Sequence, residues 1–486
     1  MAAKCKWNIA LLIIVLAVST WGKPKCRTRF ITDVVCEAGK EDYVLRRGLV
    51  SDNNMTIGIK LKSCRITAVD LDAFLNNYNL EEIDLSRNKI SHIEKGVFDG
   101  NPNLHTLSLS QNLLTKLSLG LFDQLPRFRR LDISDNKITT LELGIFDHSP
   151  ELTRLELTGN GLPGKNLHPS LFEHNSDIMF LHLSGNDMSL LPHNILQGLR
   201  KLKILALNNC SLIEVPKFAT SSNLKTLKQL RLQTNDIKRL DDPATFANLE
   251  NLATLDLLNN KIDHLHADIF RPLTKLDLLD LSFNKIQVIP ENLFEEMFRL
   301  HNLDLSYNLI DTVPLSAFYG TRLSTLRLSS NRISYLETNF CAELRRNNAR
   351  LVTFEFEHNP FQCACLLEIL NEVKKFGIEY KSDTYKGDEA DFIFREQFFL
   401  QLNNSRSNLF TFLFGGNPFQ CACLLEILSD ALKFNIRYNS DNYDGEKPVC
   451  FMTNVFTCIR HKSDFEYLSI HFQNIPVNAF FDNVLD

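Results

Sequence analysis

The chain has 486 residues, of which 44% are hydrophobic and 23% charged, and its formal net charge is −5. Such a small charge over this length gives no general indication of a nucleic-acid partner or an anionic membrane. Length alone would suggest two or three domains, but a regular repeat runs through most of the chain. It indicates one elongated solenoid with a module at each end.

The first 22 residues predict a secretory signal peptide. Lys4 and Lys6 precede an apolar run over 9–18, and small residues lead to Gly22, where we expect cleavage. A membrane anchor would be the competing interpretation, but ten apolar residues are too few for a bilayer span of about 20. We therefore expect a secreted, extracellular protein without a membrane anchor, in which cysteines can form disulfides.

Residues 23–56 lack the repeat frame and predict an N-terminal cap. The first coil of a solenoid has an uncovered apolar end, and a short segment closed by a disulfide can cover it. We expect this disulfide to join Cys26 and Cys36.

About twelve repeats follow over 57–350, and the segment LDLSFNKIQVIPENLF at 279–294 shows their frame. Each LxL part predicts a short strand, and successive strands should stack in parallel. One polar position recurs every 23 to 26 residues, and its side chain should turn inward to hydrogen-bond the backbones of adjacent turns. This ladder position is held by Cys64, Asn88, Asn112, Asn136, Asn160, Asn186, Cys210, Asn235, Asn260, Asn284, Asn308 and Asn331. We expect its two cysteines to be small buried residues, since free cysteine is often buried.

A phenylalanine recurs nine to twelve residues after the ladder position in most units. Rings at this spacing should stack along the side of the coil opposite the strands and fill its core. The series is Phe74, Phe98, Phe122, Phe146, Phe172, Phe246, Phe270, Phe294, Phe318 and Phe340.

The repeats resemble the 24-residue class of extracellular leucine-rich repeats, as in Toll-like receptor ectodomains and many secreted arthropod proteins. This resemblance implies an α/β-type solenoid, the leucine-rich-repeat horseshoe with a parallel concave sheet. It is specific for the fold and only weakly specific for function.

The block NPFQCACLLEIL occurs twice, at 359–370 and at 417–428. It resembles the cysteine-rich C-terminal cap of extracellular leucine-rich-repeat proteins, and its apolar spacing predicts an amphipathic helix across the end of the stack. The resemblance implies a complete cap over 408–486, with disulfides Cys421–Cys450 and Cys423–Cys458. The first copy, over 351–407, has no further cysteines and is incomplete.

Two caps in series are unexpected, because a cap ends a stack. Either the first copy has become a linker or side-packed module, or the two copies are alternative versions of one segment joined in this sequence. An unpaired Cys341, Cys363 or Cys365 would be able to link two chains, so a homodimer or disulfide-linked oligomer is one expected assembly.

No constellation indicates catalysis, a cofactor or a metal. The string GNGLPGKN at 159–166 satisfies GxGxxG, but it contains the ladder residue Asn160 and lacks the strand–loop–helix context of a phosphate site. The CxC pairs lack the remaining ligands of a closed zinc site.

The candidate binding site is a set of large apolar residues on the solvent side of the predicted sheet. A solvent-facing sheet needs no such residues, so a cluster predicts a contact site. One cluster contains Phe180 and Ile204 with Ala206, and the preferred one contains Leu258, Leu278, Phe283 and Tyr307. The accompanying aspartates are expected to be an ordinary solvated column.

Sequons predict N-glycosylation at Asn54, Asn209 and Asn403. Taken together, we expect a secreted protein that binds a macromolecule, most simply an extracellular protein or receptor ectodomain, through its concave face. The resemblance favours innate immune recognition, and an organiser of extracellular matrix or cell adhesion in development is the alternative.

Overall fold

The computed structural model describes residues 25–29, 33–37, 41–50, 54–361, 363–381, 411–413 and 437–439. Several predictions lie outside these residues: the signal peptide, the glycan at Asn403, and the disulfides of Cys421, Cys423, Cys450 and Cys458. The chain divides into two compact units. Unit 1 runs to Lys261 and includes Pro272–Leu276, and unit 2 comprises Ile262–Arg271 and the residues from Asp277.

Unit 1 begins with the predicted N-terminal disulfide. Strands β1 (Lys25–Arg29) and β2 (Asp33–Glu37) pair antiparallel, with Cys26 opposite Cys36, and a disulfide joins the two cysteines. Strand β2 then pairs in parallel with β4 (Gly58–Lys60), the first repeat strand. The predicted Cys26–Cys36 disulfide is therefore confirmed.

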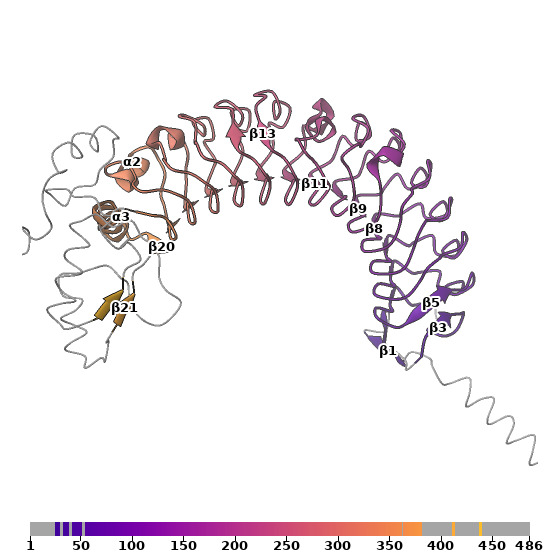
Figure 1. The fold of residues 1–486 in the computed structure, drawn as a ribbon. Coiled ribbons are helices and arrows are strands. Elements are labelled where there is room, and N and C mark those ends of the chain that lie inside the picture. The colour runs from indigo at the N-terminus through magenta and orange to yellow at the C-terminus, as the bar shows by residue number, and fades with distance from the viewer. Residues whose placement is uncertain are drawn as a thin grey trace, which may run out of the picture. The chain divides into compact units, whose positions relative to one another are not determined.

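Short parallel strands form one face of unit 1 (Figure 1). In the middle of each repeat strand from β6 to β14 is a buried leucine or isoleucine, and its two neighbours are more exposed, because successive strand side chains point to opposite faces. After β4 come β6 (Glu82–Asp84), β7 (Thr106–Ser108), β8 (Arg130–Asp132), β9 (Arg154–Glu156), β10 (Phe180–His182), β11 (Ile204–Ala206), β12 (Gln229–Arg231) and β14 (Thr254–Asp256).

The turns on the other side of unit 1 contain only short elements. These are β3 (Tyr43–Leu45), which pairs with β5 (Ile66–Val69), the two-residue β13 (Arg239–Leu240), and the 3-10 turns η1 (Gly164–Asn166), η2 (Lys217–Thr220) and η3 (Ser222–Leu224).

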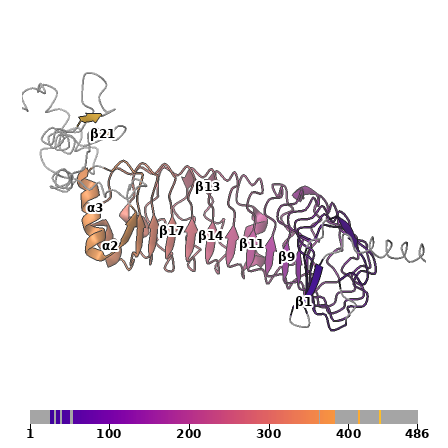
Figure 2. The same cartoon turned by 90° about the horizontal axis from the view of Figure 1, so that it is seen from below.

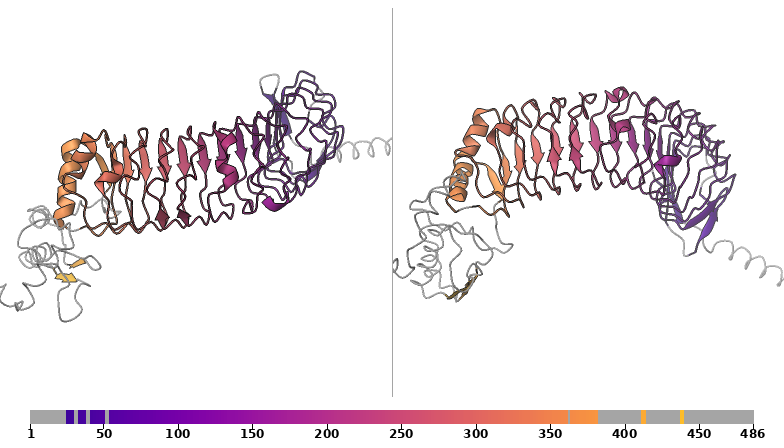
Figure 3. Two further views of the ribbon diagram at one scale, coloured as in Figure 1. Left: turned by 90° about the horizontal axis from the view of Figure 1, so that it is seen from above. Right: turned by 45° about the horizontal axis from the view of Figure 1, so that its top comes forward.

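Unit 2 continues the same construction (Figure 3). Its sheet places β16 (Leu278–Asp280), β17 (Asn302–Asp304), β18 (Thr325–Arg327), β19 (Thr353–Glu355) and β20 (Glu379–Lys381) in parallel order. Its other elements are β15 (His264–Leu265), η4 (Leu315–Phe318) and the helices α2 (Phe340–Arg346) and α3 (Cys363–Phe376). The predicted leucine-rich-repeat solenoid is confirmed.

The ladder residues hold neighbouring turns together. The side-chain oxygen of Asn308 accepts a hydrogen bond from the Ile286 backbone nitrogen at 3.0 Å. Its nitrogen donates to the carbonyls of Leu281 at 2.9 Å and Leu305 at 3.1 Å. Cys64 occupies the same position and is buried, and its backbone nitrogen donates to Asn88. The ladder therefore supplies partners for backbone groups that would otherwise be buried unpaired.

The phenylalanine series forms the predicted core. All ten rings are buried, and ring centroids of successive repeats lie 6.0 Å apart for Phe74 and Phe98 and 6.1 Å apart for Phe270 and Phe294. Rings of neighbouring repeats thus stack on one another inside the core.

The first copy of the C-terminal block packs at the end of unit 2. Helix α3 lies against α2 (Figure 2), and the Glu372 carboxylate accepts backbone hydrogen bonds from Cys341 and Ala342 in the first turn of α2. Strand β20 then adds to β19. The first copy is thus built into the sheet.

The second copy repeats the strand pair of the first. Strands β21 (Thr411–Leu413) and β22 (Arg437–Asn439) pair in parallel, with Phe412 opposite Tyr438. In the first copy Phe354 lies opposite Tyr380. Phe412 follows Phe354 by 58 positions, and Tyr438 follows Tyr380 by the same number. The two copies therefore share one strand register.

Candidate partner-binding site

A column of residues in the left-handed backbone conformation runs beside the ladder. Each member directly precedes a ladder residue, and we call this set the rim column. Its members are Ser63, Arg87, Gln111, Asp135, Gly159, Gly185, Asn209, Thr234 and Asn259 in unit 1, and Phe283, Tyr307, Ser330 and His358 in unit 2. All have φ between 52° and 70°. The conformation turns the following ladder side chain into the core.

Backbone hydrogen bonds place the rim residues of unit 2 on successive rungs. The Phe283 nitrogen donates to the Ser306 carbonyl at 3.0 Å, Tyr307 donates to Ser329 at 2.8 Å, and Ser330 donates to Glu357 at 2.8 Å. Side chains of consecutive rim residues therefore stand next to each other, one repeat apart.

Phe283 and Tyr307 form an exposed aromatic stack. Their ring centroids lie 4.1 Å apart with an angle of 9° between the planes, and the side chains are 47% and 48% exposed. Both have φ of 55°, which is unfavourable for a bulky side chain and costs on the order of 1–3 kcal/mol per residue. The other rim positions of unit 2 hold serine and histidine, so the aromatic pair is not required by the turn.

The stack lies at the edge of the sheet. Phe283 and Tyr307 each follow the last residue of their strand, β16 or β17, by three positions. Leu278 is on β16 itself and half-buried, and Leu258 is half-buried in unit 1. The structure thus brings together two of the four residues of the preferred cluster and moves them from the expected strand face to its rim.

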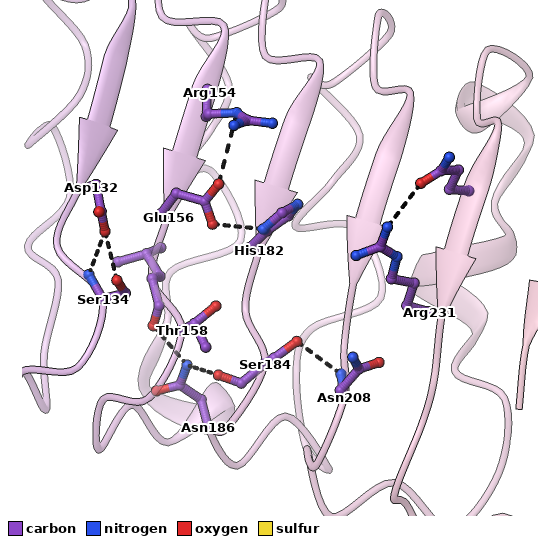
Figure 4. A network of polar contacts seen from close by, with 12 residues as sticks. Asp132, Ser134, Arg154, Glu156, Thr158, His182, Ser184, Asn186, Asn208 and Arg231 are labelled. Atoms are coloured by element: carbon purple, nitrogen blue, oxygen red, sulfur yellow. Dashed lines mark hydrogen bonds and ion pairs between the residues drawn. The ribbon is translucent and has the colours of Figure 1, made fainter. Parts of the chain in front are cut away.

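Charged side chains lie on the strands of the other cluster, in unit 1: Arg154, Glu156 and His182 form a chain of ion pairs (Figure 4). Phe180 pairs with Ile204 across β10 and β11, but the Arg154 guanidinium lies 4.6 Å from the centre of the Phe180 ring. Arg154 also faces Glu156, which contacts His182 Nδ1 at 2.6 Å. Because these charged groups lie next to Phe180, this surface is more polar than its sequence indicated.

Carboxylates follow the strand face of unit 2. Asp280 and Asp304 are opposite each other on β16 and β17. Burial, together with the Asp280 charge, raises the pKa of Asp304, although hydrogen bonds from Ser306 and the charge of Arg327 lower it. Arg327 lies 3.3 Å from Glu355 on β19. Arg327 thus lies between two carboxylates, Asp304 on β17 and Glu355 on β19.

Two cysteines of unit 2, Cys365 and Cys341, bear on the expectation that an unpaired cysteine could link two chains. Cys365 is disulfide-bonded, so the condition that it be unpaired, under which it was expected to be able to link two chains, is not met. Cys341 is buried in α2 as a free thiol. Burial, and secondarily the charge of Glu372, raises its pKa to about 12. A thiol so protected is poorly suited to intermolecular pairing.

The predicted glycosylation sites differ in position. Asn54 is exposed next to the first repeat, and its backbone carbonyl accepts a hydrogen bond from Asn79. Asn209 is an exposed member of the rim column. Both remain predictions as glycan acceptors.

The glycine-rich string at 159–166 is part of the repeat architecture. Asn160 makes ladder hydrogen bonds to Ile138, Ile133 and Leu157, and only the three-residue turn η1 follows. Among the described residues, no group of three or more potential metal ligands occurs. Nor is any helix in the described part of the chain long and apolar enough to cross a membrane.

Comparison with known proteins supports the same construction. The leucine-rich repeat family model matches residues 59–114, 102–162, 225–286 and 274–333. This protein is therefore built on leucine-rich repeats, a fold that generally provides binding scaffolds. No curated protein matches the sequence.

Several solved structures are similar. A leucine-rich-repeat protein of Leptospira interrogans is 26% identical with a TM-score of 0.60, covering 68% of this chain and 78% of that one. TLR13, in complex with ssRNA13, is 25% identical with a TM-score of 0.57, and the match covers 68% of this chain and 50% of TLR13. Toll of Drosophila, in complex with Spatzle, is 24% identical with a TM-score of 0.54, and the match covers 68% of this chain and 45% of Toll. This chain thus spans half or less of the two receptor chains.

Proposed function

We propose that this protein is a secreted binding protein that recognises an extracellular protein partner at the rim of unit 2. The observation that carries the proposal is the exposed stack of Phe283 and Tyr307 in an unfavourable backbone conformation. Rigid aromatic groups are frequent hot spots of protein interfaces because they bury a large area at a low entropy cost.

The conformational cost strengthens this inference. Glycine, asparagine or serine at a rim position meets the need for positive φ with less strain, and such residues occupy several other rim positions. Two adjacent aromatic residues therefore cost stability without filling the core, and binding energy is the compensation that we infer.

A protein is a better candidate partner than a nucleic acid. The similar TLR13 structure holds ssRNA, but the strand face beside the aromatic pair carries Asp280 and Asp304. Carboxylates repel a polyphosphate backbone, whose binding depends on lysine and arginine.

Innate immune recognition as a soluble receptor, carrier or decoy is the favoured role, and organisation of matrix or cell adhesion is the alternative. The likeness to Toll concerns the fold and does not separate them. Expression induced by infection would support the immune role, whereas constitutive expression patterned by tissue would support the developmental one.

The test is affinity capture from extracellular fluid with the secreted protein as bait, under non-reducing conditions. We expect the double variant Phe283→Ala/Tyr307→Ala to be secreted normally and to lose the captured partner by at least about tenfold, the scale of a hot spot. Unchanged capture would contradict the proposal.

A matched control removes one Phe and one Tyr from elsewhere in unit 2. Phe298 and Tyr319 are 48% and 36% exposed and lie outside the rim column. The variant Phe298→Ala/Tyr319→Ala removes similar exposed aromatic area and should leave capture unchanged.

A further inference from the structure

Positive charge is concentrated where five strands of unit 1 begin. We define the strand-start surface as the first residue of each strand from β8 to β12 together with the residue before it. These residue pairs include five cations and no acid, and none of the side chains is buried. The cations are Arg129, Arg130, Arg154, Lys203 and Lys228. This surface is thus basic, although the whole chain has a formal net charge of −5.

Backbone contacts place these residues on successive rungs. Arg130 on β8 is in register with Arg154 on β9. Beside the strands, the Lys203 nitrogen donates to the Met179 carbonyl and the Lys228 nitrogen to the Lys203 carbonyl, both at 2.8 Å. Cations therefore lie on both sides of β10, at intervals of about 4.8 Å between strands.

An apolar centre lies between the two groups of cations. Met179 and Phe180 at β10 and Ile204 at β11 are half-buried, and Phe180 is in register with Ile204. The Arg154 guanidinium lies 4.6 Å from the centre of the Phe180 ring, as in a cation–π contact. Methionine, aromatic residues and arginine are enriched in protein interfaces, where an apolar centre has a polar border. The composition of the surface therefore indicates a protein contact.

Three of the five cations lack an acidic partner. Arg129 binds Glu151 at 2.9 Å, and Arg154 lies 3.7 Å from Glu156. In the described part of the chain no ion pair involves the other three, which are all exposed: Arg130, Lys203 and Lys228. Because like charges on neighbouring strands repel each other, Lys203 and Lys228 cost stability in the absence of an anion. Carboxylates of a partner would remove this repulsion.

An acidic peptide fits this surface better than a linear polyanion does. Nucleic acids are bound chiefly through their phosphates by lysine and arginine, and sulfated glycans carry charge in the same repetitive way. Here Met179 and Phe180 interrupt the cations at β10. The carboxylates of Asp132 and Glu156 stand at the other end of β8 and β9 (Figure 4), where they would repel further phosphate or sulfate groups.

We propose that the strand-start surface binds an extended acidic segment of an extracellular protein, in which an apolar side chain stands between two groups of carboxylates. The carboxylates pair with Arg130 at one end and with Lys203 and Lys228 at the other. The apolar side chain contacts Phe180 and Ile204. The four strand spacings from β8 to β12 amount to roughly 19 Å, which an extended segment of about six residues spans. This site does not include the rim of unit 2, so it adds a second binding surface to the proposed function.

The experiment measures the binding of labelled probes to the secreted full chain by fluorescence anisotropy. The main probe is the peptide DDGLGDD. The comparison peptides are DDGSGDD, which lacks the apolar side chain, and KKGLGKK, which has the opposite charge. A thymidylate hexamer and a heparin-derived hexasaccharide represent the linear polyanions. We expect DDGLGDD to bind at least about fivefold more tightly than each of the others, and to bind more weakly as added salt screens its charges.

Four results would overturn the assignment. Equal binding of DDGSGDD would show that the apolar centre takes no part, and equal binding of KKGLGKK would show that the cations take none. Equal or tighter binding of the hexanucleotide or the hexasaccharide would make the surface a polyanion site. Absence of binding by every probe would contradict the proposal directly.

Substitutions locate the bound peptide. Lys203→Gln/Lys228→Gln removes two unpaired cations and should weaken DDGLGDD binding at least about fivefold. Ile204→Thr should reduce the preference for DDGLGDD over DDGSGDD to below about twofold. The fold should accept this change, because Thr106 and Thr254 hold the equivalent position of β7 and β14. Unchanged binding in the lysine variant, or an unchanged preference in the Ile204 variant, would exclude this surface.

A matched control removes two lysines elsewhere in unit 1. Lys95 and Lys116 are exposed in the turns after β6 and β7 and lie outside the strand-start surface. Lys95→Gln/Lys116→Gln changes the net charge equally and should leave peptide binding unchanged. An equal loss in this control would reduce the effect to net charge and overturn the assignment.

The outcome is independent of that at the rim of unit 2. If Phe283→Ala/Tyr307→Ala loses the captured partner while DDGLGDD fails to bind the parent chain, the proposed function stands and this assignment fails. If DDGLGDD binds as expected but the aromatic variant retains capture, this assignment stands and the rim proposal fails.

Discussion

The Glu372 carboxylate on α3 accepts a hydrogen bond from the Cys341 backbone nitrogen of α2 at 3.0 Å, and its second oxygen lies 3.3 Å from the nitrogen of Ala342. Asn339, at the N-cap of α2, makes no side-chain capping bond. A residue some thirty positions away thus satisfies the unpaired first turn of this helix, where a negative charge is also favourable.

Replacing Glu372 should therefore loosen α2. We expect Glu372→Ala to destabilise the α2–α3 contact by about 1–2 kcal/mol, and Glu372→Gln to cost less because its amide oxygen can still accept one bond. Hydrogen exchange at the amides of Cys341 and Ala342 should accelerate roughly 5- to 30-fold in the alanine variant. Unchanged exchange would show that the capping contact contributes nothing.

The ladder makes a second stability prediction. Asn308→Ala removes acceptors and donors for Ile286, Leu281 and Leu305 at once, and leaves buried backbone groups unpaired. We expect a loss of about 3 kcal/mol in the free energy of unfolding, measured by urea titration. Asn302→Ala, a half-exposed asparagine on β17, is the control and should change stability by less than about 0.5 kcal/mol.

Two phenylalanines four residues apart, one in the core and one on the surface, allow a direct comparison of stability. Phe294 is fully buried and stacks on Phe270, whereas Phe298 is 48% exposed. Phe294→Ala should lower the free energy of unfolding by about 3–5 kcal/mol, because it removes buried apolar area and leaves a cavity. Phe298→Ala should change the free energy of unfolding by less than about 0.5 kcal/mol. Similar losses in thermal unfolding for the two variants would contradict the assignment of the phenylalanine series to the core.

The raised pKa of Asp304 predicts an unusual pH dependence. Because burial favours the protonated form in the folded state, the folded chain binds this proton more tightly than the unfolded chain. This contribution to stability is therefore present at acidic pH and is lost as pH rises from the unfolded pKa through the folded one. Asp304→Asn should be more stable than the parent at pH 7, with the difference disappearing below about pH 3. If Asp304→Asn were less stable than the parent by the same amount at pH 7 and at about pH 3, this explanation would be excluded.

The free thiols should be inert in the folded protein. Burial raises the pKa of Cys64 to about 11 and the pKa of Cys210 and Cys341 to about 12. At pH 8 only about one thiol in a thousand or fewer would be ionised, and the thiolate is the reactive form. Iodoacetamide followed by peptide mapping should modify these three cysteines only after denaturation. Modification of Cys341 in the native protein would reopen its role in chain linkage.

Much of the construction follows from the sequence alone. The ladder asparagines, the phenylalanine series and the Cys26–Cys36 pair could be predicted, because a repeat places the same residue type in the same local environment in every turn. A period of about 24 residues therefore encodes the strand, the inward turn and the core position together.

The candidate site depended on contacts between repeats. Phe283 and Tyr307 could be identified as unusual, but their exposure, their left-handed backbone and their 4.1 Å stack emerged only when the rungs were placed side by side. The capping of α2 by Glu372 and the engagement of Cys365 in a disulfide likewise required coordinates. Sequence periodicity determined which side chains point into the core, whereas the stacking of different repeats decided which outer side chains meet, since adjacent positions on the rim are 23 to 28 residues apart in the chain.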